Sequence, residues 1–521
     1  MANKYDVIII GSGFGGAVTA CRLAERGQRV LILERGRRWE PKDYPREPTD
    51  PWIYDQNKPD KFNGWLDFNF LGTSKMTVVT GAGVGGGSLV YANVSAIPPR
   101  EGFEKGWPPE IKYDDLLPYY KTVGDMLKVC KIPKNQLTKH YEVVRQAAER
   151  AGFSDRFDRL ELAVNFDQNF DVNARPYSDE QTIYKENDFG VVQGTCVHSG
   201  NCDVGCQVRA KNTLDVNYLA VAEKKGAEIR PLHMARYLKP ASNGYTVFYD
   251  AIKNGELEAG SETAERVILA AGSLGSSELL LRSRDQYKTL PNVSRYLGCN
   301  WSSNGDFLTP AIHKHRDVSM WEGPTITCGI DFLKDPYEGQ RFVIEDGGGP
   351  NFLLNWLKAE NARGEKVNLL VKELNKFLQG DEKEIMLWFA NGIDAANGTL
   401  VLRRQWYWPW TRRLHLMWEI EKSKALFDTI FRMHKLLAQA TGGEVLESVP
   451  FKYFNLLVTP HPLGGCNMGQ SAADGVVNHL GEVFGYPRLY VADGAIIPEA
   501  IGINPSRTIA ALAERIVKFM S

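Results

Sequence analysis

The amino-acid sequence predicts an α/β protein, in which a Rossmann-like domain is joined to a second, α+β domain built on an antiparallel sheet. One observation is the strand–turn–helix–strand pattern of residues 5–34, where apolar runs flank a glycine-rich turn. Another is that apolar runs suited to the same sheet recur far along the chain, at 265–284 and 488–498. Residues 306–454 instead contain alternating strand-like runs, which indicate a different kind of sheet.

These patterns predict a Rossmann-like domain that is assembled from separated segments of the chain. Its expected parts are residues 1–45, 75–110, 195–305 and 455–521. The second domain is expected to comprise residues 46–74, 111–194 and 306–454. Within it we expect an amphipathic stretch at 351–380 and a turn at 345–350 (EDGGGP). The aromatic segment at 405–413 is expected to pack inside the domain rather than contact a partner or a membrane surface, because aromatic residues are usually buried.

Composition narrows the class of protein. A chain of 521 residues with 43% hydrophobic content can bury a large core. Its 62 Lys and Arg against 63 Asp and Glu leave a net charge of -1, which gives no field that attracts nucleic acid or an anionic membrane. No apolar run reaches the roughly 18 residues that span a bilayer, and no cleavable leader precedes the first strand. We therefore expect a cytoplasmic protein with a small-molecule partner, and the oligomeric state stays open.

The turn after the first strand reads GSGFGG, residues 11–16. In a complete strand–turn–helix–strand unit this spacing predicts a dinucleotide site, with the helix N-terminus supplying N–H donors to phosphate. Gly11 permits the tight turn, Gly13 lets the backbone approach a pyrophosphate, and Gly16 allows the helix to pack closely on the strand. Glu34, at the end of the second strand, is expected to accept hydrogen bonds from a ribose 2′-hydroxyl, which disfavours NADP.

A second glycine-rich segment, TGAGVGGGSLVYANV at residues 80–94, bears on the choice between FAD and NAD. Such a run lets the backbone pass against a large flat ring where side chains would collide. The alternative is a flexible surface loop, against which the flanking apolar residues argue. The segment therefore favours a flavin.

Eight cysteines in 521 residues are too few for a disulfide scaffold, so reduced thiols are expected. Three of them, Cys196, Cys202 and Cys206, cluster in the segment CVHSGNCDVGC. A zinc or iron–sulfur site normally needs four ligands at tighter spacing, although His198 or a distant cysteine could complete one. We expect a structural loop and no metal, and the role of the three thiols stays open.

Two local patterns near the C-terminus have chemical meaning. His461 opens the segment HPLGGC, whose proline biases the backbone to extended geometry and whose glycines permit close approach to a planar ring. Histidine accepts protons near neutral pH, so His461 is a candidate base. Asn504 is expected to cap a helix that begins at Pro505, and the positive end of this helix would stabilise negative charge on a reduced flavin. The alternative is a capped helix that only packs.

Together these motifs resemble the glucose–methanol–choline (GMC) family of flavoprotein oxidoreductases, and most closely its cholesterol oxidase branch. GSGFGG with Glu34 is similar to the adenine-nucleotide motif, and GAGVGGGSLV to the flavin-cradling loop. LAAGSLGSSELLLRSRD, HPLGGC and VADGAIIPEAIGINPSRTIAALAER follow in the family's order. The resemblance implies a FAD-binding domain of the GMC or glutathione-reductase type, with FAD bound non-covalently. The implied cofactor-binding residues are Gly11, Ser12, Gly13, Phe14, Gly15, Gly16, Glu34, Gly81, Gly83, Gly85, Gly86, Ser88, Asn93, Ala271, Gly272, Asp493, Gly494, Asn504 and Pro505.

The same resemblance implies an active site of His461, Asn504 and Glu345. His461 would bind and deprotonate a hydroxyl group, Asn504 would orient the substrate and tune the flavin, and Glu345 would move a proton during steroid double-bond migration. The implied reaction is hydride transfer from a bulky apolar alcohol to FAD, with a 3β-hydroxysteroid as the hypothesis and dioxygen or another compound as electron acceptor. The alternatives are a lyase or isomerase of the same family, and a dehydrogenase of a different alcohol that uses a non-oxygen acceptor.

Overall fold

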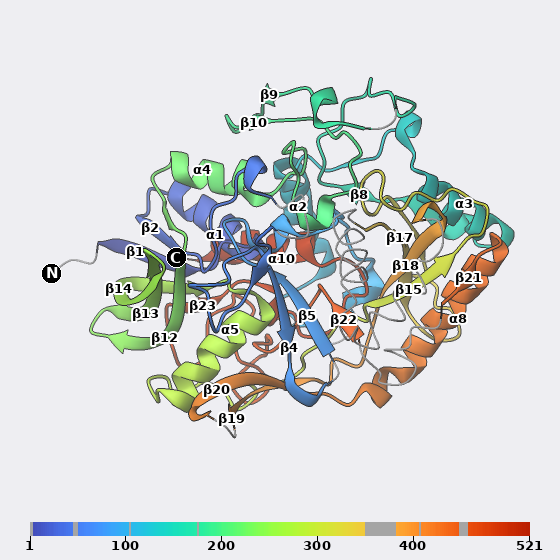
Figure 1. The fold of residues 1–521 in the computed structure, drawn as a ribbon. Coiled ribbons are helices and arrows are strands. Elements are labelled where there is room, and N and C mark those ends of the chain that lie inside the picture. Colours follow the sequence, from blue (N-terminus) through green and yellow to red (C-terminus); the bar gives the residue numbers. More distant parts are fainter. Residues whose placement is uncertain are drawn as a thin grey trace.

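The computed structural model describes residues 4–44, 50–74, 76–103, 106–174, 177–349, 382–405, 408–446 and 457–520. Two large sheets lie apart in the molecule, at the left and right of Figure 1, each with helices packed on it. One sheet has seven strands, drawn from the beginning, middle and end of the chain. The other has six strands and is antiparallel throughout. This architecture confirms the predicted combination of a Rossmann-like fold with an α+β substrate-binding region.

The seven-stranded sheet has the order β11-β2-β1-β14-β13-β12, and β23 also pairs with β14. The pairs within β11, β2, β1, β14 and β23 are parallel, whereas β12, β13 and the first part of β14 form an antiparallel meander. Near-continuous apolar runs such as YDVIII suit parallel strands that are covered on both faces. The strands are β1 (Tyr5–Ile10), β2 (Val30–Leu33), β11 (Glu228–Arg230), β12 (His233–Ala241), β13 (Gly244–Lys253), β14 (Glu256–Leu269) and β23 (Leu489–Val491).

Helices pack on the parallel part of this sheet. α1 (Phe14–Glu25) lies against α4 (Tyr218–Lys224) and α10 (Ser506–Phe519). A Cβ atom at Gly16 would lie 2.1 Å from the carbonyl oxygen of Gly11, so only glycine lets α1 begin this close to the preceding turn. Two further helices are α2 (Tyr113–Met126), which packs on α10, and α5 (Gly272–Leu281), which follows β14.

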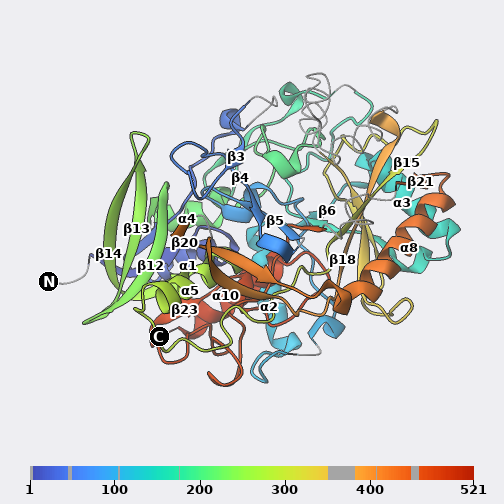
Figure 2. The same ribbon diagram turned by 60° about the horizontal axis from the view of Figure 1, so that its bottom comes forward.

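The six-stranded sheet has the order β21-β15-β18-β17-β16-β7. α3 (Lys139–Arg150) and α8 (Lys424–Ala440) pack on this sheet and on each other, as Figure 2 shows. Both helices bury one apolar stripe, the pattern of a helix that lies on a sheet. The strands are β7 (Phe157–Arg159), β15 (Phe307–Ile312), β16 (Cys328–Asp331), β17 (Phe342–Gly347), β18 (Ile385–Gly392) and β21 (Glu444–Val445).

A four-stranded sheet of order β22-β5-β4-β3 lies between the two large sheets (Figure 1). β5 leads into the glycine-rich segment and pairs in parallel with β22, which leads directly to His461. Two predicted parts of the site therefore start from neighbouring strands. The strands of this four-stranded sheet are β3 (Ile53–Tyr54), β4 (Leu66–Phe70), β5 (Met76–Gly81) and β22 (Leu457–Thr459). Two-stranded ladders complete the described strands: β6 (Cys130–Lys131) with β8 (Glu161–Leu162), β9 (Lys185–Glu186) with β10 (Val192–Gln193), and β19 (Thr399–Gln405) with β20 (Trp408–Met417).

One local prediction was wrong. The start of EDGGGP is not a turn, because Glu345 to Gly347 are the last residues of β17, every residue of which is buried. Pairing with β16 and β18 on its two sides keeps this segment extended. The stretch 351–380 and the side chains of 405–411 lie outside what the structure describes, and the predicted domain boundaries stay predictions. Over the described ranges, no helix is both long and apolar enough to cross a membrane.

Candidate active site

Predicted site residues gather at the carboxyl ends of four parallel strands. The GSGFGG turn follows β1, Glu34 follows β2, Ala271 and Gly272 follow β14, and Asp493 follows β23. In open α/β sheets this edge is where ligands bind. Residues from four separate parts of the sequence are therefore brought to one end of the sheet.

The turn between β1 and α1 is shaped for close backbone approach. Gly11 has a φ of +97°, and a Cβ there would lie 2.4 Å from the carbonyl oxygen of Ala270. A Cβ at Gly15 would lie 1.5 Å from the carbonyl oxygen of Ala492. α1 begins after Gly13 without a side-chain cap and without an acidic residue in its first turn. Its N-terminal N–H groups and positive dipole end are thus available to an anionic group such as a pyrophosphate.

The second glycine-rich segment lies directly against this turn. A Cβ at Gly86, where φ is +53°, would lie 2.6 Å from the Cα of Gly13. Ser12 joins the two segments, because its hydroxyl oxygen accepts from the backbone N–H of Gly85 at 3.0 Å and lies 3.2 Å from the carbonyl oxygen of Gly83. The structure therefore brings together the two glycine motifs that the sequence separates by about seventy residues.

Glu34 is buried beside the turn, with 4% of its surface exposed. One carboxylate oxygen accepts from the backbone N–H of Ser12 at 3.0 Å and from its hydroxyl at 2.7 Å, and the other accepts from the backbone N–H of Gly36 at 2.9 Å. These bonds fix the carboxylate at the end of β2. That is the position from which an acidic residue binds a ribose hydroxyl in Rossmann folds.

Asn93 gives direct evidence for a bound polar group. It is fully buried with a φ of +68°, and among the described residues neither its amide nitrogen nor its amide oxygen has a hydrogen-bond partner. A buried amide without partners costs roughly 1–3 kcal/mol, so such a group is expected to meet a ligand. Together with the glycine cradle, the open helix N-terminus and Glu34, Asn93 makes a donor and acceptor set that fits FAD.

Asp493 fastens the C-terminal segment to the start of α5. Its carboxylate accepts from the backbone N–H of Gly272 at 2.9 Å and from the hydroxyl of Ser276 at 2.5 Å, and its other oxygen accepts from the N–H of Ala495. Burial raises the pKa of Asp493 to about 6. Ala271, Gly272, Asp493 and Gly494 therefore form one connected corner at the strand ends.

His461 is held by a buried carboxylate that the sequence analysis did not identify. Its Nδ1 lies 3.0 Å from Oδ1 of Asp306, which is fully buried. The hydroxyl of Thr459 donates to the other oxygen of Asp306 at 2.6 Å and accepts from the backbone N–H of His461 at 2.9 Å. A carboxylate at Nδ1 favours the tautomer with its proton there, which leaves the Nε2 lone pair free as an acceptor.

Glu345 and Asn504 meet in the same region. The amide nitrogen of Asn504 donates to Oε2 of Glu345 at 3.4 Å, and both side chains are buried. Oε1 of Glu345 and Oδ1 of Asn504 have no partner among the described residues. Phe389, the cross-strand partner of Glu345, places its ring centre 6.1 Å from that of His461. The three predicted catalytic residues are therefore brought together around one aromatic ring.

Asn304 is a second residue that sequence reasoning missed. Its amide oxygen accepts from the backbone N–H groups of Ile501 and Gly502, both at 3.0 Å, and its amide nitrogen donates to the carbonyl of Ile503 at 2.9 Å. It thereby fixes the loop that leads to Asn504. Since Asn304 and Asp306 lie two residues apart, one short segment positions both Asn504 and His461.

The expected cap of the last helix was wrong by one residue. α10 starts at Ser506, its N-cap is Pro505, and no side chain caps it. The first helical hydrogen bond runs from the N–H of Ile509 to the carbonyl of Pro505. The amide nitrogen of Asn504 donates to Glu345, and its amide oxygen, the atom that would cap the helix, has no partner among the described residues. The uncapped N–H groups of α10 still present a positive dipole end beside Asn504.

Glu345 gives a testable pH dependence of stability. Burial raises its pKa to about 8, against the lowering effect of the hydrogen bond from Asn504. A glutamate in an unfolded chain titrates near its ordinary value of about 4.3. Between these values the folded protein keeps a proton that the unfolded chain releases, so this group lowers stability progressively as pH rises from about 5 to 8.

We expect Glu345→Gln to remove that loss. The variant should gain on the order of 3 kcal/mol in unfolding free energy at pH 8 relative to its difference from wild type at pH 5. Urea unfolding of the two proteins at both pH values measures this, with the exposed Glu256→Gln as control. Parallel pH profiles of the variant and the wild type would show that Glu345 ionises normally in the folded protein.

The cysteine-bearing loop lies next to this site. Cys196, Cys202 and Cys206 are free thiols, and all three line one cavity of about 20 Å³. Burial raises the pKa of Cys196 and of Cys206. Within the described part of the chain, no three His, Cys, Asp or Glu side chains are grouped so that they could hold a metal ion.

The sequence of this chain is similar to those of known proteins. A family model described as GMC oxidoreductase matches residues 410–513, and one described as NAD(P)-binding Rossmann-like domain matches residues 9–39. A cholesterol oxidase of Acinetobacter baumannii is 30% identical over 99% of this chain and 94% of its own length. A cholesterol oxidase of Mycobacterium tuberculosis is also 30% identical, over 99% of this chain and 91% of its own length. A long-chain-alcohol oxidase of Arabidopsis thaliana is 24% identical, over 98% and 66% respectively.

Solved structures agree on the fold. Pyridoxine 4-oxidase from Mesorbium loti superposes with a TM-score of 0.65 at 16% identity, covering 99% of both chains. A fungal aryl-alcohol oxidase superposes with a TM-score of 0.60 at 14% identity, also covering 99% of both chains. The end-to-end match to the cholesterol oxidases settles what the glycine motifs and the strand-end site indicate. The chain belongs to the GMC oxidoreductase family, in its cholesterol oxidase-like branch, and is an FAD-dependent alcohol oxidase or dehydrogenase.

Proposed function

We propose that the enzyme oxidises the hydroxyl-bearing carbon of a bulky apolar alcohol, a 3β-hydroxysteroid, and holds its FAD non-covalently. The observation that carries the steroid assignment is the buried pair of Glu345 and Asn504 beside His461. Alcohol oxidation needs one base. A second proton-transfer group next to it suits a substrate whose double bond migrates after oxidation. The cholesterol oxidase relatives support the same substrate class.

His461 acts as the base in this proposal. Asp306 accepts a hydrogen bond from Nδ1–H and keeps the imidazole in one orientation, so that Nε2 takes the proton of the substrate hydroxyl. The two glycine segments, Glu34 and Asn93 would hold FAD. When bound, it would supply the acceptor for the hydride that leaves the hydroxyl-bearing carbon of the substrate. The hydroxyl proton and the hydride together account for the two hydrogens lost when the alcohol becomes a ketone.

Glu345 and Asn504 act on the product ketone. Oε1 of Glu345 is buried and has no partner in the part of the chain that the structure describes, so it is available to take a proton from the carbon next to the carbonyl and return it further along the ring. The amide nitrogen of Asn504 keeps Oε2 of Glu345 in place. Its amide oxygen, which has no partner among the described residues, would bind and orient the substrate. The uncapped N-terminus of α10 would stabilise negative charge that develops beside Asn504.

Asp306 should matter through His461 alone. We expect Asp306→Asn to reduce kcat about 10²- to 10⁴-fold, because its amide N–H can face Nδ1 and favour the wrong imidazole tautomer. Flavin content should stay the same, since Asp306 bonds to His461 and Thr459 and not to the two glycine segments. Steady-state kinetics with the best alcohol, together with the visible absorbance of the variant, measure both quantities. Unchanged kcat in a variant that retains its flavin would remove Asp306 from the mechanism.

An anaerobic titration of the yellow protein with a panel of alcohols tests the substrate class. Bleaching of the flavin by 3β-hydroxysteroids, and weaker or no bleaching by long-chain primary alcohols, is the expected result. Bleaching by another alcohol but not by steroids would overturn the steroid assignment. Flavin reduction without turnover of any electron acceptor would instead favour a lyase or isomerase.

The electron acceptor and the compartment are part of the proposal. Dioxygen is the acceptor that the oxidase relatives suggest, and another acceptor would show as rapid bleaching with slow oxygen consumption. A cytoplasmic location is supported by the eight cysteines, all of which are free thiols in the structure.

A further inference from the structure

Lys211 is a buried cation that the steps proposed above do not use. Only 2% of its surface is exposed. Its Nζ donates to three backbone carbonyls: Leu89 at 3.1 Å, Tyr91 at 2.9 Å and Cys202 at 2.6 Å. An ammonium group has three donors, so each of them is used on a main-chain acceptor.

These carbonyls belong to two different segments. Leu89 and Tyr91 lie in the glycine-rich segment, after its run of glycines, and Cys202 belongs to the cysteine-bearing loop. Two more bonds join the same parts of the chain: the N–H of Leu214 donates to the hydroxyl of Ser88 at 3.1 Å, and the hydroxyl of Tyr91 donates to the carbonyl of Asn212 at 3.0 Å. Residues 202–214 are thus fixed onto residues 88–91, with Lys211 at the centre of the contact.

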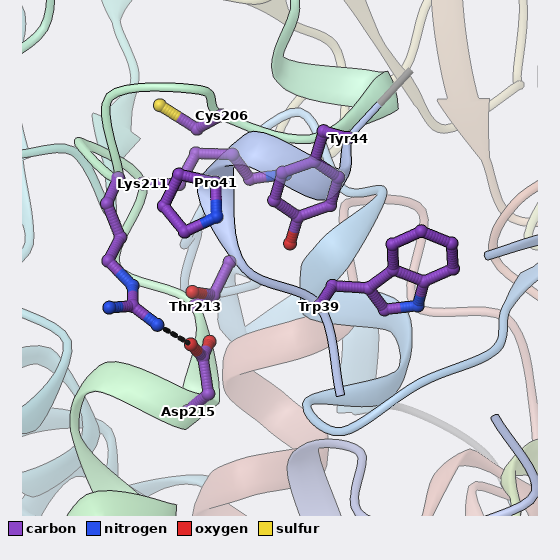
Figure 3. Close-up of a pocket in the computed structure, with 8 residues that line it drawn as sticks. Trp39, Pro41, Tyr44, Cys206, Lys211, Thr213 and Asp215 are labelled. Carbon is purple, nitrogen blue, oxygen red and sulfur yellow. Dashed lines mark hydrogen bonds and ion pairs between the residues drawn. The ribbon is translucent and has the colours of Figure 1, made fainter. Parts of the chain in front are cut away.

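An apolar cluster surrounds this contact. Val204 from the loop packs with Leu89 and with Trp39, which lies beyond β2. Figure 3 shows Lys211, Cys206 and Thr213 on one side of a small pocket of about 10 Å³, with the rings of Trp39 and Tyr44 on the other. An apolar side chain at position 211 could join this cluster, but it would leave the three carbonyls without the donor that Lys211 supplies.

The fold instead keeps a charge there at a cost. Burial lowers the pKa of Lys211 to about 8, against the raising effect of Cys202, Asp203, Cys206 and Asp215. A methionine of similar length would carry no such desolvation penalty. The ammonium group donates a hydrogen bond to each of the three carbonyls, which would otherwise be buried without this donor. This interaction explains why a lysine is retained here.

We propose that Lys211 is a positioning residue for the flavin site, whose ammonium fixes the end of the glycine-rich segment against the cysteine-bearing loop so that the segment is preformed for FAD. Gly86 of that segment touches the nucleotide turn at Gly13, so a shift of residues 88–91 reaches the FAD cradle through a few backbone atoms. This inference rests on the proposed binding of FAD between the two glycine motifs.

The test measures FAD release from diluted holoprotein by the recovery of flavin fluorescence. We expect Lys211→Ala to raise the dissociation constant of FAD at least about tenfold, the factor that corresponds to 1.4 kcal/mol. Adding n-propylammonium should restore at least about a third of the lost affinity, because it returns N–H donors to the space that the truncated side chain leaves. Tetramethylammonium, a cation without N–H donors, should not. Lys225→Ala, an exposed lysine of the neighbouring α4 segment, is the matched control and should bind FAD as the wild type does.

The possible outcomes separate this inference from the proposed function. Wild-type protein that binds no FAD would refute the flavin site itself. Wild-type protein that binds FAD while Lys211→Ala binds it equally tightly would overturn only the role of Lys211, as would equal rescue by both cations. If Lys211→Ala does not fold, Lys211→Met keeps the side-chain volume, and we expect it to lose FAD affinity to the same degree without rescue. Normal affinity in Lys211→Met would overturn the inference.

Discussion

Replacement of His461 by Gln is expected to slow flavin reduction by alcohol about 10²- to 10⁴-fold, the usual contribution of a positioned general base. Asp306 holds the imidazole at Nδ1, and the Thr459 hydroxyl accepts from the backbone N–H of His461, so Nε2 is the ring nitrogen left as acceptor. A glutamine amide has no comparable basicity, so the hydroxyl proton has no local acceptor. Stopped-flow measurement of flavin bleaching under anaerobic conditions reports this step without reoxidation.

Two controls make the His461 result specific. The flavin content of His461→Gln should match that of the wild type, because the nucleotide is held by residues at the other end of the site. His315→Gln replaces an exposed histidine and should reduce at the wild-type rate. Bleaching of His461→Gln within a few-fold of the wild type would mean that another group takes the proton.

Glu345→Gln is expected to separate oxidation from double-bond migration. With a 3β-hydroxysteroid that has a neighbouring ring double bond, the wild type should release the conjugated ketone. The variant should release the unconjugated ketone, with migration slowed about 10²- to 10⁴-fold and oxidation changed only a few-fold. Ultraviolet absorbance of the conjugated product and chromatography of both ketones measure the two steps in one reaction.

The pH dependence of migration gives a further check on Glu345. Since burial raises the pKa of Glu345 to about 8, the fraction present as carboxylate increases as pH rises from 6 to 8. Migration in the wild type should therefore become faster relative to oxidation over this range, whereas Glu256→Gln should behave as the wild type. A conjugated product formed at the normal rate by Glu345→Gln would assign migration to a different group or to solvent.

The nucleotide end of the site could be predicted because its signals are local. The strand YDVIII, the glycine spacing of residues 11–16 and the acidic Glu34 all fall within one continuous unit, and the structure places that unit as expected. The strand-end position of Asp493 also follows from the sequence, since it comes directly after an apolar run. Short-range patterns of this kind allow the backbone geometry to be predicted without information on tertiary contacts.

The supports of the catalytic end could not be predicted in this way. Asp306 is 155 residues from His461, and no periodicity or spacing links the two. The available signal was two polar residues, Asn304 and Asp306, in a run that leads into a half-buried strand, but buried polar residues occur for many structural reasons. The contact of Lys211 with the glycine-rich segment was hidden for the same reason.

Two local rules gave wrong expectations where tertiary contacts were stronger. Glycines after Glu345 indicated a turn, but strand pairing on both sides keeps the residue in β17. The order Asn504–Pro505 indicated an N-cap, but the amide of Asn504 serves the buried carboxyl of Glu345. Both exceptions fall at the candidate active site, where side chains are positioned for chemistry at the expense of local preference.

Stopped-flow reduction of the wild-type enzyme with an alcohol deuterated at the hydroxyl-bearing carbon tests hydride transfer to bound FAD most directly. The account predicts a yellow protein whose flavin bleaches several-fold more slowly with the deuterated alcohol, with one ketone formed per flavin reduced. A colourless protein without extractable flavin, or bleaching without formation of a carbonyl product, would contradict it.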